Sequence, residues 1–257
     1  MGRFDSLVPL PSASTGYGPR FDPRWKLGAT LVGVCAALAL QHVVYALLAL
    51  LGAFGLAFAS RLQLRWLMPR IGTVLLAVSI FALPLPLLID GPGPAWEVGP
   101  VKVTSYGAIV GILLAVRAVT VVTLTLTLLA TTPLDALLKA AHALGIPGLL
   151  VQIGLMTYRY LFLLADELQR LRVAVRVRGF RNAASRHAYQ TAGQVAGTLL
   201  VRGHDRADRV HHAMRCRGFD RQFHSLTEFR THLRDVVLFL CVSSVALGLV
   251  LLDRVIS

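Results

Sequence analysis

The chain has 257 residues, of which 55% are hydrophobic and 15% are charged, and its formal net charge is +13. So low a charged fraction is unusual for a soluble domain, and the apolar residues gather into runs long enough to cross a bilayer. The composition therefore predicts an all-α integral membrane protein. Its three cysteines have no CxxC spacing, which favours packing roles over disulfides or metal ligands.

The N-terminal part of the chain predicts a cytoplasmic segment followed by two short membrane helices. Residues 1–26 hold four prolines and lack the hydrophobic core of a signal peptide, so we expect this segment to be retained. Residues 27–59 carry no formal charge and exceed the length of one typical span. They predict two helices that turn near Gln41 and His42.

The next two spans are expected on either side of an outer loop. Three arginines first predict a basic inner loop: Arg61, Arg65 and Arg70. Residues 71–89 then form an uncharged run, and Pro84 and Pro86 are expected to kink its outer end. Residues 90–103 are rich in Gly and Pro and predict a loop, and residues 106–130 predict a fourth span.

A basic segment and a final span complete the chain. Residues 131–235 hold 16 Lys and Arg against eight acidic residues, and residues 236–252 are again uncharged. The positive-inside rule places the N-terminus, the 60–70 loop and this basic segment in the cytoplasm, and the C-terminus outside. The predicted parts are the N-terminal segment 1–26, a four-helix membrane part 27–130, a cytoplasmic helical domain 131–235 and a fifth span in 236–257.

One charge lies inside a predicted span. Arg117 falls near the middle of residues 106–130, where a charge costs about 2.5–3.5 kcal/mol on insertion scales. Thr120, Thr127 and Thr131 fall near the same side of the helix. Two interpretations stay open: carbonyl groups of the bundle satisfy the guanidinium, or this intramembrane polar residue makes a fixed contact with a moving partner subunit.

The basic segment itself predicts helices with marked ends. Pro133 is expected in the first turn of a helix that Gly145 and Pro147 stop. A long helix is expected from near Leu149 to Arg178, and the residue that follows is glycine. A glycine in that place favours a left-handed C-terminal cap.

A short motif, Ala-x-Arg-x-Arg-Gly-Phe, occurs twice in this segment. The first copy begins at Ala174 and the second at Ala213, and an Asp and an Arg align upstream of both copies at the same offset. The matched residues are Asp166, Arg170, Ala174, Arg176, Arg178, Gly179 and Phe180 in the first copy, and Asp205, Arg209, Ala213, Arg215, Arg217, Gly218 and Phe219 in the second. The four-residue spacing of Asp, Arg, Ala and Arg places them on one side of each helix.

Helix-ending chemistry alone accounts for one copy of this motif, because arginine in the last turn favours the helix dipole and glycine caps the end. Capping, however, requires no fixed spacing across three turns, and both copies share that spacing. Because the side chains of Ala174 and Ala213 are small, another protein can pack closely against the helix at these positions. Arg178 and Arg217 can form bidentate hydrogen bonds with carboxylates of that protein. The repeat therefore predicts two copies of one docking surface.

Several other chemistries find no support in the sequence. None of the three lysines belongs to a Gly-x4-Gly-Lys-Ser/Thr loop, so ATP is not expected to bind in that way. Seven of the eight histidines lie between residues 142 and 232, but none forms an i,i+4 pair, and no metal ligands are predicted. No Gly-x-Ser-x-Gly elbow occurs, so we predict neither catalytic residues nor a cofactor.

At the twin motif the chain resembles the T component of energy-coupling-factor importers, whose scaffold subunit ends two cytoplasmic coupling helices with Ala-Arg-Gly motifs. The matching triplets are Val177-Arg178-Gly179 and Cys216-Arg217-Gly218. Three further stretches resemble this family in the same order: Asp22–Leu27, Thr131–Pro147 and Met156–Glu167. The cobalt-type, CbiQ-like branch is the most similar, through the residues around the second motif. Val177 and Cys216 depart from the small first residue of the triplet.

The resemblance implies a non-enzymatic scaffold in the bacterial inner membrane, with a cytoplasmic N-terminus and contacts with membrane lipid. Its implied partners are two ABC-type ATPase subunits and a substrate-specific membrane subunit that binds cobalt or nickel, and no nucleic acid. The implied ATPase-coupling residues are Ala174, Arg176, Arg178, Gly179, Ala213, Arg215, Arg217 and Gly218. A vitamin such as biotin is an alternative cargo. From other classes, a lipid-processing membrane enzyme and a membrane-anchored nucleic-acid binder stay as alternatives.

Overall fold

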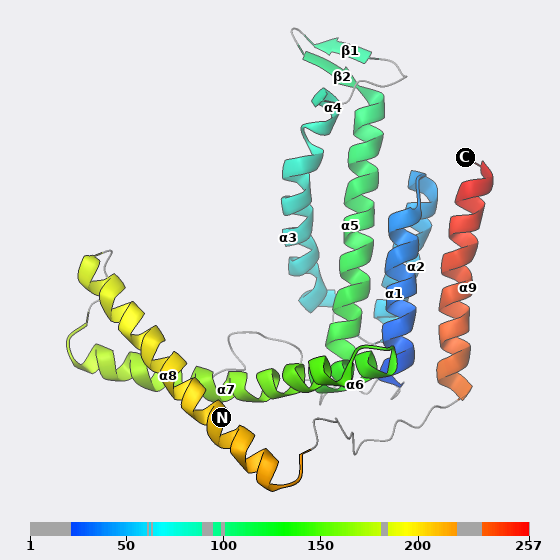
Figure 1. Ribbon diagram of the computed structural model, residues 1–257. Coiled ribbons are helices and arrows are strands. Elements are labelled where there is room, and N and C mark those ends of the chain that lie inside the picture. The colour runs from blue at the N-terminus through cyan, green and yellow to red at the C-terminus, as the bar shows by residue number, and fades with distance from the viewer. Residues whose placement is uncertain are drawn as a thin grey trace. The chain divides into compact units, whose positions relative to one another are not determined.

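The computed structural model describes residues 22–60, 62, 64–88, 95–98, 101–180, 185–219 and 233–256. These residues form helices and one β-hairpin (Figure 1). The chain divides into two compact units: residues 1–140 together with 228–257, and residues 141–227. The first unit holds most of the apolar helices, and the second holds the two long helices that carry the twin motif.

The described residues of the first unit form a bundle that contains five long helices. They are α1 (Pro23–Ala39), α2 (Val43–Ala59), α3 (Leu64–Ala82), α5 (Ser105–Thr131) and α9 (Leu233–Ile256). Because α1 ends at Ala39 and α2 begins at Val43, the turn predicted near Gln41 and His42 is confirmed. Within this bundle, α3 and α5 run in opposite directions, as do α5 and α9 (Figure 1).

The composition of the helices identifies a multi-pass membrane protein. Among the described residues, three helices are long and apolar enough to cross a bilayer: α5 over Tyr106–Thr131, α7 over Gly148–Val177 and α9 over Leu233–Val255. Val43–Ala59 and Leu67–Ala82 are shorter apolar helices. The prediction of an all-α membrane protein is confirmed. The appearance of α7 among the candidate spans was not expected, because its second half carries five charged residues.

Two helix boundaries differ from the prediction. The expected basic loop is partly helical, since α3 begins at Leu64 and includes Arg65 and Arg70. Arginine ends an apolar run but is itself a good helix former, so the helix extends beyond its apolar part. At the other end, the expected kink is a break: α3 ends at Ala82, and the short helix α4 (Leu85–Leu88) follows. Pro84 disfavours the helical conformation of the residue before it.

The predicted outer loop contains a β-hairpin. Strand β1 (Ala95–Val98) pairs antiparallel with β2 (Val101–Thr104), and Glu97 lies opposite Lys102. Three of the four residues of β2 are β-branched, and β-branched residues favour strands. The sequence predicts a loop here because Gly and Pro residues indicate turns, and each strand has only four residues, which is too short to give a clear strand pattern.

Small residues let the helices of the bundle approach closely. A Cβ atom added to Gly28 of α1 would lie 3.2 Å from the ring of Phe239 in α9, and this ring also lies 5.2 Å from the ring of Trp25. Helix α5 contacts α1, α2 and α3 and contributes Val119 to a core cluster with Ala57 of α2. Close approach through small residues is typical of packed membrane helices.

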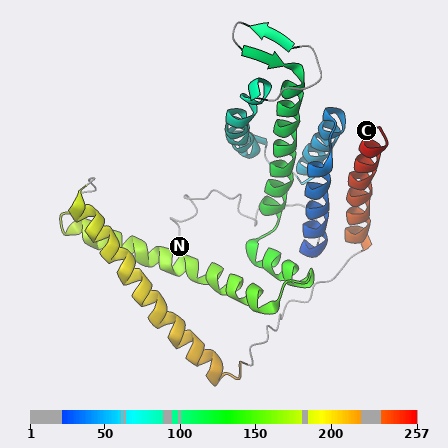
Figure 2. The ribbon, with the colours of Figure 1, turned by 45° about the horizontal axis from the view of Figure 1, so that its top comes forward.

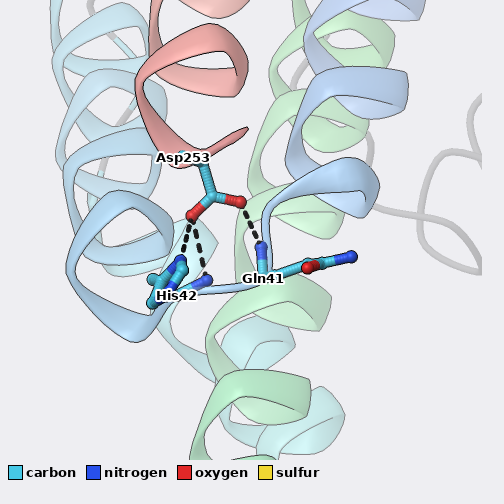
Figure 3. Close-up of polar contacts among 3 residues, drawn as sticks. All are labelled: Gln41, His42 and Asp253. Atoms are coloured by element: carbon cyan, nitrogen blue, oxygen red, sulfur yellow. Dashed lines mark hydrogen bonds and ion pairs between the residues drawn. The ribbon is translucent and has the colours of Figure 1, made fainter. Parts of the chain in front are cut away.

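A buried carboxylate joins the end of the chain to the turn between the first two helices. Asp253 in the last turn of α9 is 1% exposed and accepts hydrogen bonds from the backbone N–H groups of Gln41, at 2.6 Å, and His42, at 3.1 Å (Figure 3). The Nδ1 atom of His42 lies 2.8 Å from the same carboxylate. His42 is the N-cap residue of α2, so Asp253 accepts from the N–H of the N-cap residue itself and from the N–H before it, at the helix end where backbone donors lack partners within the helix.

Candidate functional site

The two long helices of the second unit, and the short helix α6 that precedes them in the chain, begin or end at residues that the sequence marks. Helix α6 spans Leu134–Ala143, α7 spans Gly148–Val177, and α8 spans Arg186–Cys216. Gly145 ends the first of these with a φ of 104°, as predicted. Ser185 is the N-cap of α8, where its side chain accepts a hydrogen bond of 3.2 Å from the backbone N–H of Ala188.

Both copies of the motif end their helices with the same hydrogen bonds. Gly179 and Gly218 have φ values of 85° and 77°, so the predicted left-handed caps are confirmed. After α7, the N–H of Phe180 bonds to the carbonyl of Val175, and that of Gly179 to Arg176. After α8, Phe219 bonds to Met214 and Gly218 to Arg215 in the same pattern. These are two Schellman caps, which fix the direction of each arginine next to its glycine.

The positive φ values at these glycines lead to a first prediction, because other residues are strained in that conformation. We expect Gly218→Ala to lower the free energy of unfolding by about 1–2 kcal/mol, because alanine is penalised in the left-handed conformation. Gly193 is a matched control in the interior of α8: a Cβ atom there meets no other atom within 4 Å, and its φ is not positive. Gly193→Ala should raise stability by about 0.5–1 kcal/mol. Thermal unfolding of the purified variants measures both changes, and equal midpoints would contradict the assignment of the cap.

The side chains of the repeated stripe are all exposed. Asp166, Arg170, Ala174 and Arg178 are exposed along α7 and its cap, and so are Asp205, Arg209, Ala213 and Arg217 along α8. The other predicted coupling residues, Arg176, Gly179, Arg215 and Gly218, are exposed too. In the isolated chain, both copies of the motif are therefore accessible to another protein.

The two helices cross at positions that are equivalent in the repeat. A Cβ atom added to Gly203 of α8 would lie 3.8 Å from Cδ2 of Leu164 in α7, an ordinary van der Waals distance, so the two helices are in contact there. The offset from Leu164 to Gly203 along the chain is the same as the offset from Ala174 to Ala213, which relates the two copies of the motif. An ion pair between Glu167 and Arg202 lies beside the crossing. Both views of the ribbon show α7 and α8 meeting and then diverging (Figures 1 and 2).

This crossing gives the two motifs equal distances from a common point. The stretch of chain from Leu164 to Arg178 is as long as the stretch from Gly203 to Arg217. With the rise per residue of an α-helix, each arginine lies about 21 Å along its helix from the crossing. The structure therefore does not bring the two motifs together but places them at the ends of two arms of equal length.

A cleft between the helices makes the two copies differ. It has a volume of about 230 Å³. Its lining residues are Leu163, Leu164, Glu167, Arg202, Asp205, Arg206 and Arg209. Asp205 and Arg209 belong to the second copy of the stripe, whereas their equivalents in the first copy, Asp166 and Arg170, do not line the cleft. The sequence repeat alone gave no sign of this difference.

The histidines do not assemble into a metal site in the described residues. No group of three or more His, Cys, Asp or Glu side chains in this part of the chain is placed to hold a metal ion. On α8, His204 pairs only with Asp208, one turn later in this described helix; their side chains are 3.6 Å apart and well exposed.

Arg117 lies in the middle of α5, as predicted, and its side chain is partly buried. The nearby threonines are satisfied within the helix: the hydroxyl groups of Thr120, Thr127 and Thr131 each donate to the carbonyl four residues earlier. The Nε atom of Arg117 is buried and has no hydrogen-bond partner among the described residues. Of the two interpretations offered for Arg117, a guanidinium satisfied by carbonyls of its own bundle therefore lacks support.

Comparison with known proteins identifies the family. A family model described as cobalt transport protein, CbiQ, matches residues 19–228. The chain belongs to the CbiQ family. It is 28% identical over 235 residues to the nickel permease LarQ of Lactiplantibacillus plantarum, a match that covers 88% of this chain and 76% of LarQ.

Relatives in the energy-coupling-factor group are similar over most of their length. The chain is 28% identical over 249 residues to the energy-coupling factor transporter transmembrane protein EcfT of Streptococcus thermophilus, which covers 90% of this chain and 92% of EcfT. A shorter match, 33% identical over 97 residues, relates it to the cobalt transport protein CbiQ of Rhodobacter capsulatus and covers 38% of this chain and 39% of that protein. The chain is thus a T component of an energy-coupling-factor transporter, near the CbiQ branch.

Proposed function

We propose that this T component couples ATP hydrolysis by two partner ATPases to the uptake of a cobalt or nickel ion bound by a separate substrate-specific membrane subunit. One observation carries the proposal: two copies of one arginine motif are exposed at the ends of two helical arms of equal length. A paired motif of this kind fits a pair of ATPase subunits, each of which takes one helix end.

The chemistry of each helix end favours an acidic groove. Arg178 and Arg217 each lie at the C-terminal end of a helix, where the last carbonyl groups carry partial negative charge. Each arginine is exposed and can bind a carboxylate through two hydrogen bonds. Ala174 and Ala213 lie one turn earlier on the same side and leave room for the wall of a groove. When the two ATPases close on ATP, the distance between their grooves changes. Arms that cross at Leu164 and Gly203 transmit that change to the rest of the chain.

The proposed location is the bacterial inner membrane, with the N-terminus and residues 131–235 in the cytoplasm. In this topology α7 is a surface helix and not a sixth span, although its first half is apolar. Leu149, Leu150 and Ile153 are each more than half exposed, so this half can lie against membrane lipid while the charged half stays in water.

Cobalt and nickel are proposed as cargo because a cobalt transport family model covers most of the chain and a nickel permease is among its relatives. The vitamin alternative stays testable, because in this scheme another subunit sets specificity. The test is uptake by vesicles that contain the T component with its ATPases and substrate-specific subunit. We expect ATP-dependent accumulation of cobalt or nickel that stops when the T component is omitted. Accumulation of biotin without either metal would overturn the cargo assignment, and uptake without the T component would overturn its role.

A further inference from the structure

The charge at the centre of α5 remains without a partner in the described residues. Helix α5 runs from Ser105 to Thr131, so Arg117 lies about 18 Å along the helix from its start and about 21 Å from its end. An arginine side chain is too short to reach either membrane surface from that depth. The Nε atom is buried and unpaired, and the side chain as a whole is only partly covered by the bundle.

The acidic residues of the bundle lie elsewhere. Asp22 precedes α1, Asp235 lies in the first turn of α9 and Asp253 in its last turn. Asp253 is already bonded to Gln41 and His42. Because each of these carboxylates stands at a helix end, none of them is at the depth of Arg117. The described part of the bundle therefore offers this cation no carboxylate at mid-membrane.

The neighbouring threonine hydroxyl groups do not bind the guanidinium of Arg117 either. Thr120 and Thr123 are almost fully buried, and their hydroxyl groups donate to the carbonyls of Val116 and Val119. These bonds satisfy the hydroxyl donors within α5 itself. An unpaired arginine in this position costs about 2.5–3.5 kcal/mol on insertion, so its presence calls for a compensating contact outside the chain.

We propose that Arg117 binds a carboxylate on a transmembrane helix of the substrate-specific subunit, which makes α5 a contact surface for that subunit. The inference rests on the proposed function, which supplies a second membrane protein. Charge complementarity selects an acid, since a guanidinium pairs with a carboxylate in a bidentate manner. The carboxylate must come from a membrane helix and the partner cannot be a lipid phosphate, because lipid head groups lie at the membrane surfaces and Arg117 lies midway between them.

The test compares Arg117→Met with the wild-type chain in the assembled complex. Methionine keeps much of the length of the side chain and removes the charge. We expect the amount of substrate-specific subunit that co-purifies with the T component to fall about tenfold or more, because one partner of a buried ion pair is lost. The ATPases should stay bound, since their motifs are in the second unit. Arg65→Met, which removes an exposed arginine at the start of α3, is the matched control and should retain both partners.

A second measurement separates a contact with a partner from a structural role. The isolated T component with Arg117→Met should insert and unfold thermally like the wild type or better, because an unpaired charge is gone. A lower unfolding temperature of the isolated variant would overturn the proposal, as would full retention of the substrate-specific subunit. If the wild-type chain bound neither ATPases nor a membrane subunit, the proposed function itself would fail.

Reversal of charge identifies the partner residue. Arg117→Glu should abolish co-purification of the substrate-specific subunit. Changing one acidic residue within the spans of that subunit to arginine should then restore it. If no such acid restores the complex, the assignment of a carboxylate is overturned.

Discussion

Replacing Arg178 and Arg217 together by glutamate is expected to leave the protein in the membrane and to release its ATPases. Each arginine is exposed at the end of its helix, so the change disturbs no packing within the chain. Each substitution removes a charge-assisted contact and adds repulsion from the acidic groove. At about 2 kcal/mol for each lost contact, the affinity for the ATPase pair should fall about a thousandfold. Co-purification of the ATPases from detergent-solubilised membranes measures this loss.

The control for this experiment changes the net charge equally at two other exposed arginines. Arg172 lies on α7 outside the repeated stripe, and Arg234 lies in the first turn of α9. Arg172→Glu combined with Arg234→Glu should keep the ATPases bound. If the pair at positions 178 and 217 also retained them, the docking role of the motifs would be refuted. Each single change is expected to weaken binding less than the double change, because one arm stays attached.

The second large effect is expected at Asp253. Asp253→Ala should lower the free energy of unfolding by about 2–4 kcal/mol, because two backbone N–H groups at the start of α2 lose their acceptor in a buried place. Asp253→Asn keeps one carbonyl oxygen and should cost less. Thermal unfolding of the purified chain, followed by circular dichroism, measures the loss.

The exposed Asp208 offers a matched control. Its carboxylate lies 3.6 Å from His204 in a solvent-exposed arrangement on α8. Such a surface pair contributes little, so Asp208→Ala should change stability by less than about 0.5 kcal/mol. Similar losses for Asp208→Ala and Asp253→Ala would show that the buried carboxylate does not hold α9 to the turn between α1 and α2.

The local features of this fold could be predicted from the sequence because their causes are local. The left-handed caps at Gly179 and Gly218 follow from a glycine placed directly after a helix-forming run. The turn between α1 and α2 follows from a simple excess of length over one span. In both cases the residues that determine the structure belong to the same continuous stretch of the chain as the structure itself.

The features that were missed depend on residues far apart in the chain. In the sequence, Asp253 is only the charge that follows the last uncharged run, and its partner His42 lies 211 residues away. The helices α7 and α8 cross at Leu164 and Gly203, which lie outside the repeated motif. A leucine and a glycine in two helices do not by themselves predict that the helices are in contact there. The hairpin was missed for a different reason, because two strands of four residues are too short to outweigh the turn residues around them.

The contact between α7 and α8 at Leu164 and Gly203 also limits how these helices can change in length. One residue inserted between the crossing and Arg178 or Arg217 would rotate that arginine by about 100° and move it about 1.5 Å outward. A full turn of the helix would be needed to restore its direction, and its arm would then be longer than the other. Insertions and deletions are therefore expected to be rare from Leu164 to Arg178 and from Gly203 to Arg217, because they would change both the direction and the reach of an arginine.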